Sequence, residues 1–236
     1  ISNRSPPHHE PPEMIIIAID GPAAGGKGTL SARIATHLGY GRLDSGKLYR
    51  ATAAYLMENG QNPDDVEAAT HGARQISAKD LENPALVEDP VALVAAKIAA
   101  YGPVRAELLK FQQDFAKNPE ISGSPAPGAV IDGRDIGTVV CPEADVKLFV
   151  TADLEVRAAR RLKELRDRGE GSIKADVLQD MRVRDARDME RSESPLRQAA
   201  DAHLLDTTGL NADQAFEAAL KIITSIIGVG GRKSDA

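Results

Sequence analysis

Cysteine is nearly missing from this chain of 236 residues, in which Cys141 is the single one. One cysteine excludes an internal disulfide framework and a zinc site made of several cysteines. Long apolar segments are missing too: none approaches the roughly 18–20 residues of a membrane-spanning helix, and no basic segment precedes an apolar one as in a signal peptide. The net charge of −6 gives no general attraction to nucleic acids or anionic membranes. We therefore expect a soluble, cytoplasmic monomer with no nucleic-acid or membrane partner.

The apolar residues that are present follow two alternating patterns. Short continuous runs predict five strands, at 14–19, 40–44, 129–132, 146–151 and 202–208. Helical spacing predicts helices at 27–38, 45–60, 91–117, 153–168, 173–190 and 211–227. Strands that alternate with helices indicate an α/β fold with parallel strands and right-handed crossovers. In that architecture, ligands bind at the carboxyl ends of the strands.

Three segments depart from this alternation. Residues 1–13 contain four prolines and no apolar periodicity, so we expect a disordered tail, and residues 228–236 are expected to be a flexible end. This leaves one domain over residues 14–227. Within it, residues 60–90 have weak periodicity and three prolines, which predicts an insertion with short helices. The sequence leaves open whether this insertion is a surface excursion or part of a functional site.

A glycine-rich segment, GPAAGGKGTL, follows the first predicted strand directly and leads into the first predicted helix. It fits the pattern G-x-x-x-x-G-K, with Gly21, Gly26 and Lys27. Glycines allow successive backbone N–H groups to turn inward, and the following helix adds its positive end, so such a loop binds anions. Lys27 would add a mobile positive charge for the β- and γ-phosphates. The segment therefore predicts a binding site for a nucleoside triphosphate.

The hydroxyl group after the lysine comes one residue later than in GTPases and motor ATPases. Those proteins have Ser or Thr directly after the lysine to ligate magnesium, whereas this chain has Gly28 there and Thr29 next. The GKGT string is similar to nucleoside monophosphate kinases, in which phosphates and waters hold more of the ion. Asp132, at the end of a predicted strand, is then the candidate Mg²⁺ ligand through water, with Thr29 as a second candidate. The alternative for Asp132 is a helix cap.

Arginine occurs together with carboxylate or hydroxyl groups in three clusters: LDSGKLYR (43–50), DGRDIGTVV (132–140) and RVRDARDMER (182–191). Transfer of a phosphoryl group between two anions requires cations at both and the exclusion of water. The planar guanidinium group suits this because it binds phosphate oxygens in pairs. We expect arginines of the three clusters to converge on an acceptor phosphate. The glycines in RDRGEGS (166–172) predict a hinged lid over about 166–176.

Taken together, IAIDGPAAGGKGTL, LDSGKLYR, VIDGRDIGTVV and RDARD resemble bacterial cytidylate kinases (CMP kinases) in order and approximate spacing, from about residue 14 to 227. The resemblance implies a three-layer α/β/α P-loop core with a five-stranded parallel sheet. It also implies an inserted nucleoside-monophosphate-binding subdomain over about 60–115 and a short lid that carries arginines. The implied activity is the transfer of the γ-phosphate of ATP to CMP or dCMP, with Mg²⁺.

The resemblance also implies roles for individual residues. The implied ATP-binding residues form the glycine-rich loop: Gly21, Pro22, Ala23, Ala24, Gly25, Gly26, Lys27, Gly28 and Thr29. The implied CMP-binding residues are Ser45, Arg50, Arg105, Arg134, Asp135, Arg184, Asp188 and Arg191, of which Arg50 and Arg134 hold the phosphate and Arg105 and Asp135 read the cytosine. The implied catalytic residues are Lys27, Arg134 and Arg184, together with Arg157 and Arg161 from the lid side.

Two features depart from the family pattern. Ala96 stands where the family has a serine that helps to read cytosine, and the stretch between Arg50 and Arg105 looks shorter than in many members, which carry a small antiparallel sheet there. The alternatives are another P-loop kinase, acting on AMP, UMP or a non-nucleotide alcohol, and a non-catalytic P-loop switch. The position of Thr29 and the lack of an NKxD string argue against the switch.

Overall fold

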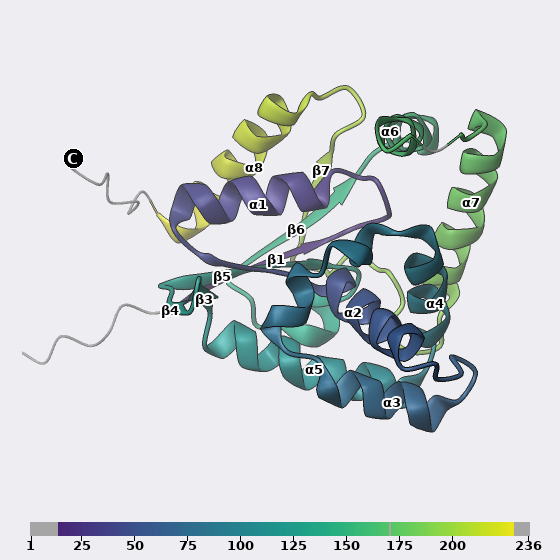
Figure 1. The fold of residues 1–236 in the computed structure, drawn as a ribbon. Coiled ribbons are helices and arrows are strands. Elements are labelled where there is room, and N and C mark those ends of the chain that lie inside the picture. Colours follow the sequence, from purple (N-terminus) through teal and green to yellow (C-terminus); the bar gives the residue numbers. More distant parts are fainter. Residues whose placement is uncertain (1–13, 170, 229–236) are drawn as a thin grey trace, which may run out of the picture.

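The computed structural model describes residues 14–169 and 171–228, so the predicted tails over 1–13 and 229–236, and one residue of the predicted lid, lie outside the described residues. Within the described part, five strands form a parallel sheet in the order β2-β5-β1-β6-β7 (Figure 1). The strands are β1 (Ile15–Asp20), β2 (Gly41–Asp44), β5 (Gly128–Gly133), β6 (Val146–Thr151) and β7 (His203–Asp206). Each strand end lies within two residues of its predicted position, so the α/β prediction is confirmed.

Helices cover both faces of the sheet. Figure 1 shows α1 (Lys27–Leu38) and α8 (Ala212–Ile227) on one side, and α2 (Ser45–Glu58) and α5 (Gly102–Lys117) on the other. Alternate residues of β1 point to opposite faces. Ile17 and Ile19 accordingly pack in the buried cluster that includes residues of α1 and α8, whereas Ala18 packs in the cluster that includes residues of α2 and α5. This explains why β1 reads as a continuous apolar run, and it confirms the three layers.

The remaining helices are α3 (Val66–Gln75), α4 (Asp89–Ile98), α6 (Leu154–Asp167) and α7 (Lys174–Glu190). The predicted single helix over 91–117 is wrong, because the chain forms α4 and then α5 with a break between them. Pro103 lies in the first turn of α5, where its missing N–H costs nothing and its fixed φ favours a helix start. The sequence did not predict this break, because the apolar residues on both sides of it keep helical spacing. No helix of the described residues is long and apolar enough to cross a membrane.

The insertion contains short helices, as its sequence predicts. They are α3 and the two 3₁₀ turns η1 (Ala78–Glu82) and η2 (Pro84–Val87), and α3 packs on α2 and α5. A two-residue hairpin, β3 (Glu120–Ile121) with β4 (Ser124–Pro125), follows α5 and lies beside β2. After β5 the chain makes one π-helical turn, η3 (Ile136–Val140). The sequence pattern predicted neither the hairpin nor this turn.

Candidate functional site

The glycine-rich loop runs from the end of β1 to the start of α1, at the carboxyl edge of the sheet. Gly21 has a φ of 145°, and a Cβ atom there would lie 1.9 Å from the carbonyl oxygen of Val150 on β6. Gly26 has a φ of 93° and directly precedes the first residue of α1. Both positions therefore require glycine. The loop can approach the neighbouring strand closely, and the N-terminal N–H groups of α1 are available to an anion.

Lys27, the first residue of α1, is buried with 6% of its surface exposed, and its Nζ donates to the carbonyl of Pro22 at 2.7 Å. Burial lowers the pKa of Lys27 well below its usual value; the nearby charges of Arg134 and Arg184 lower it further, whereas those of Asp132 and Asp20 oppose the shift. Arg184 on α7 is exposed at the surface, and partial desolvation together with the charge of Arg134 lowers its pKa to about 10. Because these three cations repel one another, an anion bound among them would lower their electrostatic energy. The cluster is therefore suited to phosphate.

Asp132 lies on β5 and is buried with 5% of its surface exposed. Its Oδ2 accepts from the hydroxyl of Ser31 at 2.5 Å and from the guanidinium of Arg42 at 3.2 Å. Burial raises the pKa of Asp132, and the charge of Arg42 opposes that shift. The alternative interpretation of Asp132 as a helix cap is wrong, because this residue lies within a strand and its partners are side chains. Sequence analysis did not predict Ser31 or Arg42.

The oxygen atoms near the loop are suited to Mg²⁺. Asp132 offers a carboxylate and Thr29 a hydroxyl, and Mg²⁺ prefers such hard oxygen ligands. Among the described residues, no group of three or more His, Cys, Asp or Glu side chains could hold a metal by itself. This donor set fits an ion that keeps several waters and takes its other ligands from substrate phosphates.

A small pocket of about 180 Å³ lies between α5 and the segment after β5. Arg105 and Asp135 line it and form a buried ion pair at 2.5 Å. The ring of Tyr49 also lines it, with its centre 5.8 Å from the guanidinium carbon of Arg105. The structure thus brings the two predicted base-reading residues together. Ala96 is not among the residues that line this pocket.

Near this pocket, Asp188 on α7 binds two of the predicted arginines. Its carboxylate lies 2.9 Å from Nε of Arg134 and 3.1 Å from a terminal nitrogen of Arg191. Arg50 on α2 donates to the carbonyl of Leu86 at 2.8 Å, and thereby joins α2 to the insertion. The hydroxyl of Ser45 lies beside Gly133 at the end of β5. The predicted acceptor residues therefore come from α2, α5, α7 and the end of β5.

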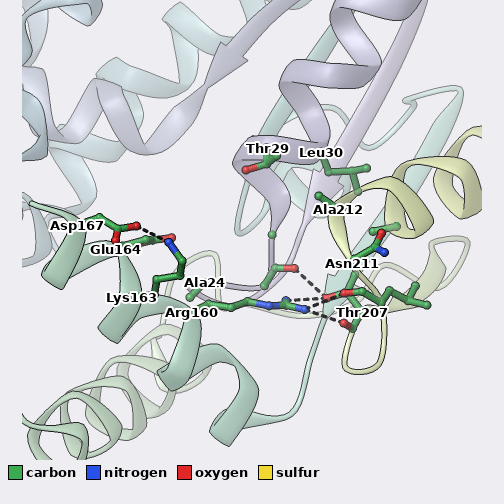
Figure 2. Close-up of a pocket in the computed structure, with 14 residues that line it drawn as sticks. Ala24, Thr29, Leu30, Arg160, Lys163, Glu164, Asp167, Thr207, Asn211 and Ala212 are labelled. Carbon is green, nitrogen blue, oxygen red and sulfur yellow. Dashed lines mark hydrogen bonds and ion pairs between the residues drawn. The ribbon is translucent and has the colours of Figure 1, made fainter.

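The larger pocket, about 370 Å³, lies beside the glycine-rich loop (Figure 2). Its lining combines loop residues with α6, α8 and the segment after β7: Ala24, Gly25, Gly26, Thr29, Leu30, Arg160, Lys163, Glu164, Asp167, Thr207, Leu210, Asn211, Ala212 and Ala215. Sequence analysis predicted the loop residues only. The polar segment after the fifth strand, DTTGLN, was the available signal, because it follows a strand end on the same edge of the sheet.

The predicted lid arginines occupy different positions. Arg157 is buried, pairs with Asp185 on α7 at 2.7 Å and donates to the carbonyl of Ala23 in the loop at 3.3 Å. Arg161 lies 3.3 Å from Asp89 at the start of α4, and so reaches the insertion. Arg160, one residue before it, lines the larger pocket instead. Near the end of α6, Arg168 donates to the carbonyl of Val87 at 3.0 Å.

Residues 17–225 of the chain match the family model described as cytidylate kinase. The chain belongs to the cytidylate kinase family. It is 56% identical over 210 residues to the cytidylate kinase of Paramagnetospirillum magneticum, covering 89% of this chain and 98% of that protein. It is 53% identical over 209 residues to the cytidylate kinase of Rhodospirillum rubrum, covering 89% and 97%. The resemblance stated from the motifs is confirmed, and these relatives give no support to a nucleotide switch or to another acceptor.

Among solved structures, the chain is similar to an uncharacterized protein from Eubacterium ventriosum. The TM-score is 0.52 at 13% identity, and the match covers 90% of this chain and 99% of the other. At that identity the likeness concerns the fold alone. The cytidylate kinase assignment therefore depends on the family model and the close relatives.

Thr207 connects three parts of the larger pocket, as Figure 2 shows. Its Oγ1 lies 3.2 Å from the carbonyl oxygen of Gly25 and 3.0 Å from that of Thr151, and it accepts from Arg160 at 2.9 Å. Arg160 also donates to the carbonyl of Thr207 at 2.7 Å. This buried hydroxyl therefore holds the loop, the end of β6 and α6 together.

Replacing Thr207 by valine, which keeps the shape of the side chain, removes that hydroxyl. We expect the KM for ATP to rise about fivefold, as for the loss of one net hydrogen bond, with the KM for CMP unchanged. Initial-rate kinetics in both substrates measure this. Thr207→Ser serves as the matched control and should behave like the wild type. An unchanged KM for ATP in Thr207→Val would mean that this hydroxyl does not shape the pocket.

Proposed function

We propose that this cytidylate kinase family member transfers the γ-phosphate of ATP to CMP and dCMP. The observation that carries the proposal is a group of three cations beside the glycine-rich loop: the buried Lys27, the half-buried Arg134 and Arg184 on α7. In this arrangement the larger pocket takes the ATP base and the smaller one the cytosine. The triphosphate of ATP and the single phosphate of CMP would then meet at the cations.

In the proposed reaction, a phosphate oxygen of CMP attacks the γ-phosphorus of ATP while the bond from that phosphorus to the β-bridging oxygen breaks, so that ADP leaves. The residues contribute positive charge and position more than covalent chemistry. Lys27 balances charge that develops as the β–γ bond breaks. Arg50 and Arg134 hold the acceptor phosphate, and Arg184 and Asp188 reach the CMP sugar. Asp132 and Thr29 would hold Mg²⁺ beside the ATP phosphates, where the ion supplies further positive charge.

Recognition of cytosine is proposed to rest on Arg105 and Asp135. Cytosine has an amino donor at N4 beside an acceptor at N3, whereas uracil has an acceptor at O4 beside a donor at N3. The carboxylate of Asp135 can accept from N4 while Arg105 donates to N3 or O2. Facing uracil, the same two groups would be left with unpaired partners, at a cost of about 1–3 kcal/mol each.

A comparison of four acceptors at fixed ATP tests this proposal. We expect CMP and dCMP to give similar kcat/KM values. UMP should be about 10- to 100-fold worse, which corresponds to one or two unpaired groups, and AMP should hardly react. ADP release measured by a coupled assay gives all four values. Equal use of UMP and CMP would contradict the roles of Arg105 and Asp135, and a preference for AMP would contradict the proposed substrate.

The division of the chain into an acceptor-binding insertion and a lid is also proposed. Residues 60–115 form the acceptor-binding insertion, and 166–176 form the lid on the ATP side. We further propose that the protein acts as a cytoplasmic monomer without nucleic-acid or membrane partners, in keeping with its net charge of −6.

A further inference from the structure

Asp20 is the last residue of β1 and directly precedes Gly21, the first residue of the glycine-rich loop. It is buried, with 5% of its surface exposed. Both of its carboxylate oxygens accept backbone hydrogen bonds: Oδ1 from the N–H of Ile136 at 2.8 Å and Oδ2 from the N–H of Gly137 at 2.7 Å. The side chain that precedes the glycine-rich loop is therefore hydrogen-bonded to a segment more than a hundred residues away in the sequence.

The segment held by Asp20 is the first two residues of η3, and this turn contributes to the smaller pocket. Asp135 precedes this turn, and its carbonyl accepts from the N–H groups of Val139 at 2.9 Å and Val140 at 3.1 Å. All three of these residues line the pocket. A single π-helical turn has little stability of its own, so its position depends on anchors outside it. The two bonds to Asp20 supply such an anchor at the end nearest to Asp135.

The chemistry of this anchor requires a carboxylate. Two N–H groups need two acceptor oxygens, and an ionised carboxylate has these and no donor. Asparagine, of the same shape, would place its NH₂ group against one of the two N–H groups. The charge is costly here, since burial raises the pKa of Asp20 to about 6 even though the two backbone hydrogen bonds lower it. Among the neighbouring charges, Asp135 raises this pKa and Lys27 lowers it.

The surroundings of Gly137 leave little room for the turn to shift. A Cβ atom at Gly137 would lie 3.1 Å from Cδ of Lys147 and 3.4 Å from Oδ2 of Asp20. The ammonium group of Lys147 is fixed in turn by Asp201 at 2.7 Å and by the carbonyl of Pro142. Gly137 thus lies between the Asp20 carboxylate and a fixed lysine stem, and the close fit favours one position of the turn.

We propose that Asp20 is a positioning residue for the acceptor. Its carboxylate holds the segment that carries Asp135 against the end of β1, so that the base pocket keeps a fixed position relative to the loop for the ATP phosphates. This inference rests on the proposed function, because it assigns the smaller pocket to cytosine. It assigns no contact between Asp20 and either substrate.

Asp20→Asn tests the proposal. We expect the KM for CMP to rise about tenfold or more, as for the loss of a hydrogen bond to a charged group, and the preference for CMP over UMP to fall. The KM for ATP should stay within about twofold of the wild-type value, because the loop's own contacts remain. Calorimetric titration of CMP into the variant without ATP should give the same loss of affinity, and thermal unfolding establishes that the variant is folded.

Asp145→Asn is the matched control. Like Asp20, Asp145 accepts a backbone N–H group: that of Ile16, 2.8 Å away, near the other end of β1. We expect its kinetic constants to equal those of the wild type. If Asp20→Asn does not fold, Asp20→Ser, which keeps one acceptor oxygen in a smaller side chain, replaces it with the same expected split.

The outcomes separate the two ideas. A rise in the KM for CMP alone supports the positioning role. Equal rises in both KM values, or no rise in either, overturn it while the proposed function stands, provided that the wild type phosphorylates CMP. If the wild type does not use CMP, the proposed function fails and this inference fails with it.

Discussion

Lys27→Ala should lower kcat about 10²- to 10³-fold, the usual effect of removing one preorganised charge that stabilises a transition state. Its ammonium group belongs to the glycine-rich loop and lies near Arg134 and Arg184, where phosphate charge is proposed to gather. The fold should survive, because the ammonium group of Lys27 donates to the carbonyl of Pro22 within the same loop and joins no distant parts of the chain by that bond. Single-turnover rates with saturating ATP and CMP measure the effect on the chemical step.

Lys110→Ala provides the control for this experiment. Lys110 is exposed on α5 and pairs with Glu107 at 2.8 Å. Its loss should leave kcat unchanged. A Lys27→Ala variant that keeps near-wild-type kcat would show that the glycine-rich loop does not hold the transferred phosphate.

Arg134→Met should raise the KM for CMP about 10- to 100-fold, which corresponds to about 1.5–3 kcal/mol for a hydrogen bond between charged groups. The affinity for ATP should not change, since Arg134 is proposed to bind the acceptor phosphate. The structure also favours a folded variant, because Asp188 keeps its second partner, Arg191, when Arg134 is lost. Titration of a non-hydrolysable ATP analogue and steady-state kinetics in CMP give the two quantities.

Arg33→Met is the matched arginine control. Arg33 pairs with Asp213 at 2.8 Å and packs over the ring of Phe216. It lines neither of the two pockets, so its replacement should alter neither substrate constant. If Arg134→Met weakened the ATP analogue and spared CMP, this arginine would belong to the other nucleotide.

The parts of the fold that depend on local pattern could be predicted from the sequence. The run IIIAI predicts a strand because both faces of β1 are buried, and Gly39 ends α1 in a left-handed conformation, as its place after the apolar spacing indicates. The break between α4 and α5 could not be placed so easily. The apolar residues on both sides keep helical spacing, and a single Pro103 is also compatible with a kinked continuous helix.

The candidate site divides in the same way. Lys27, Arg134 and Asp135 lie in strings that carry their own chemical signal. Asp20, Arg42 and Thr207 could not be assigned, because each acts on a partner far away in the sequence: Ile136, Asp132 and Gly25. Such pairs arise from the order of strands in the sheet, which single-sequence patterns do not give. The pattern also could not show which of Arg160 and Arg161 lines the larger pocket. Neighbouring residues of a helix point about 100° apart, so the answer depends on how α6 is rotated against the loop.

The contact between Arg161 and Asp89 joins α6, which lines the larger pocket proposed for ATP, to α4, which belongs to the insertion proposed to bind the acceptor. Both side chains are partly exposed, and a pair of this kind contributes about 0.2–1 kcal/mol. Thermodynamic reciprocity then limits cooperativity between the substrates through this contact: each can strengthen the binding of the other by at most about fivefold, and by the same factor. A link this weak can break and re-form in every catalytic cycle without becoming the slowest step of turnover.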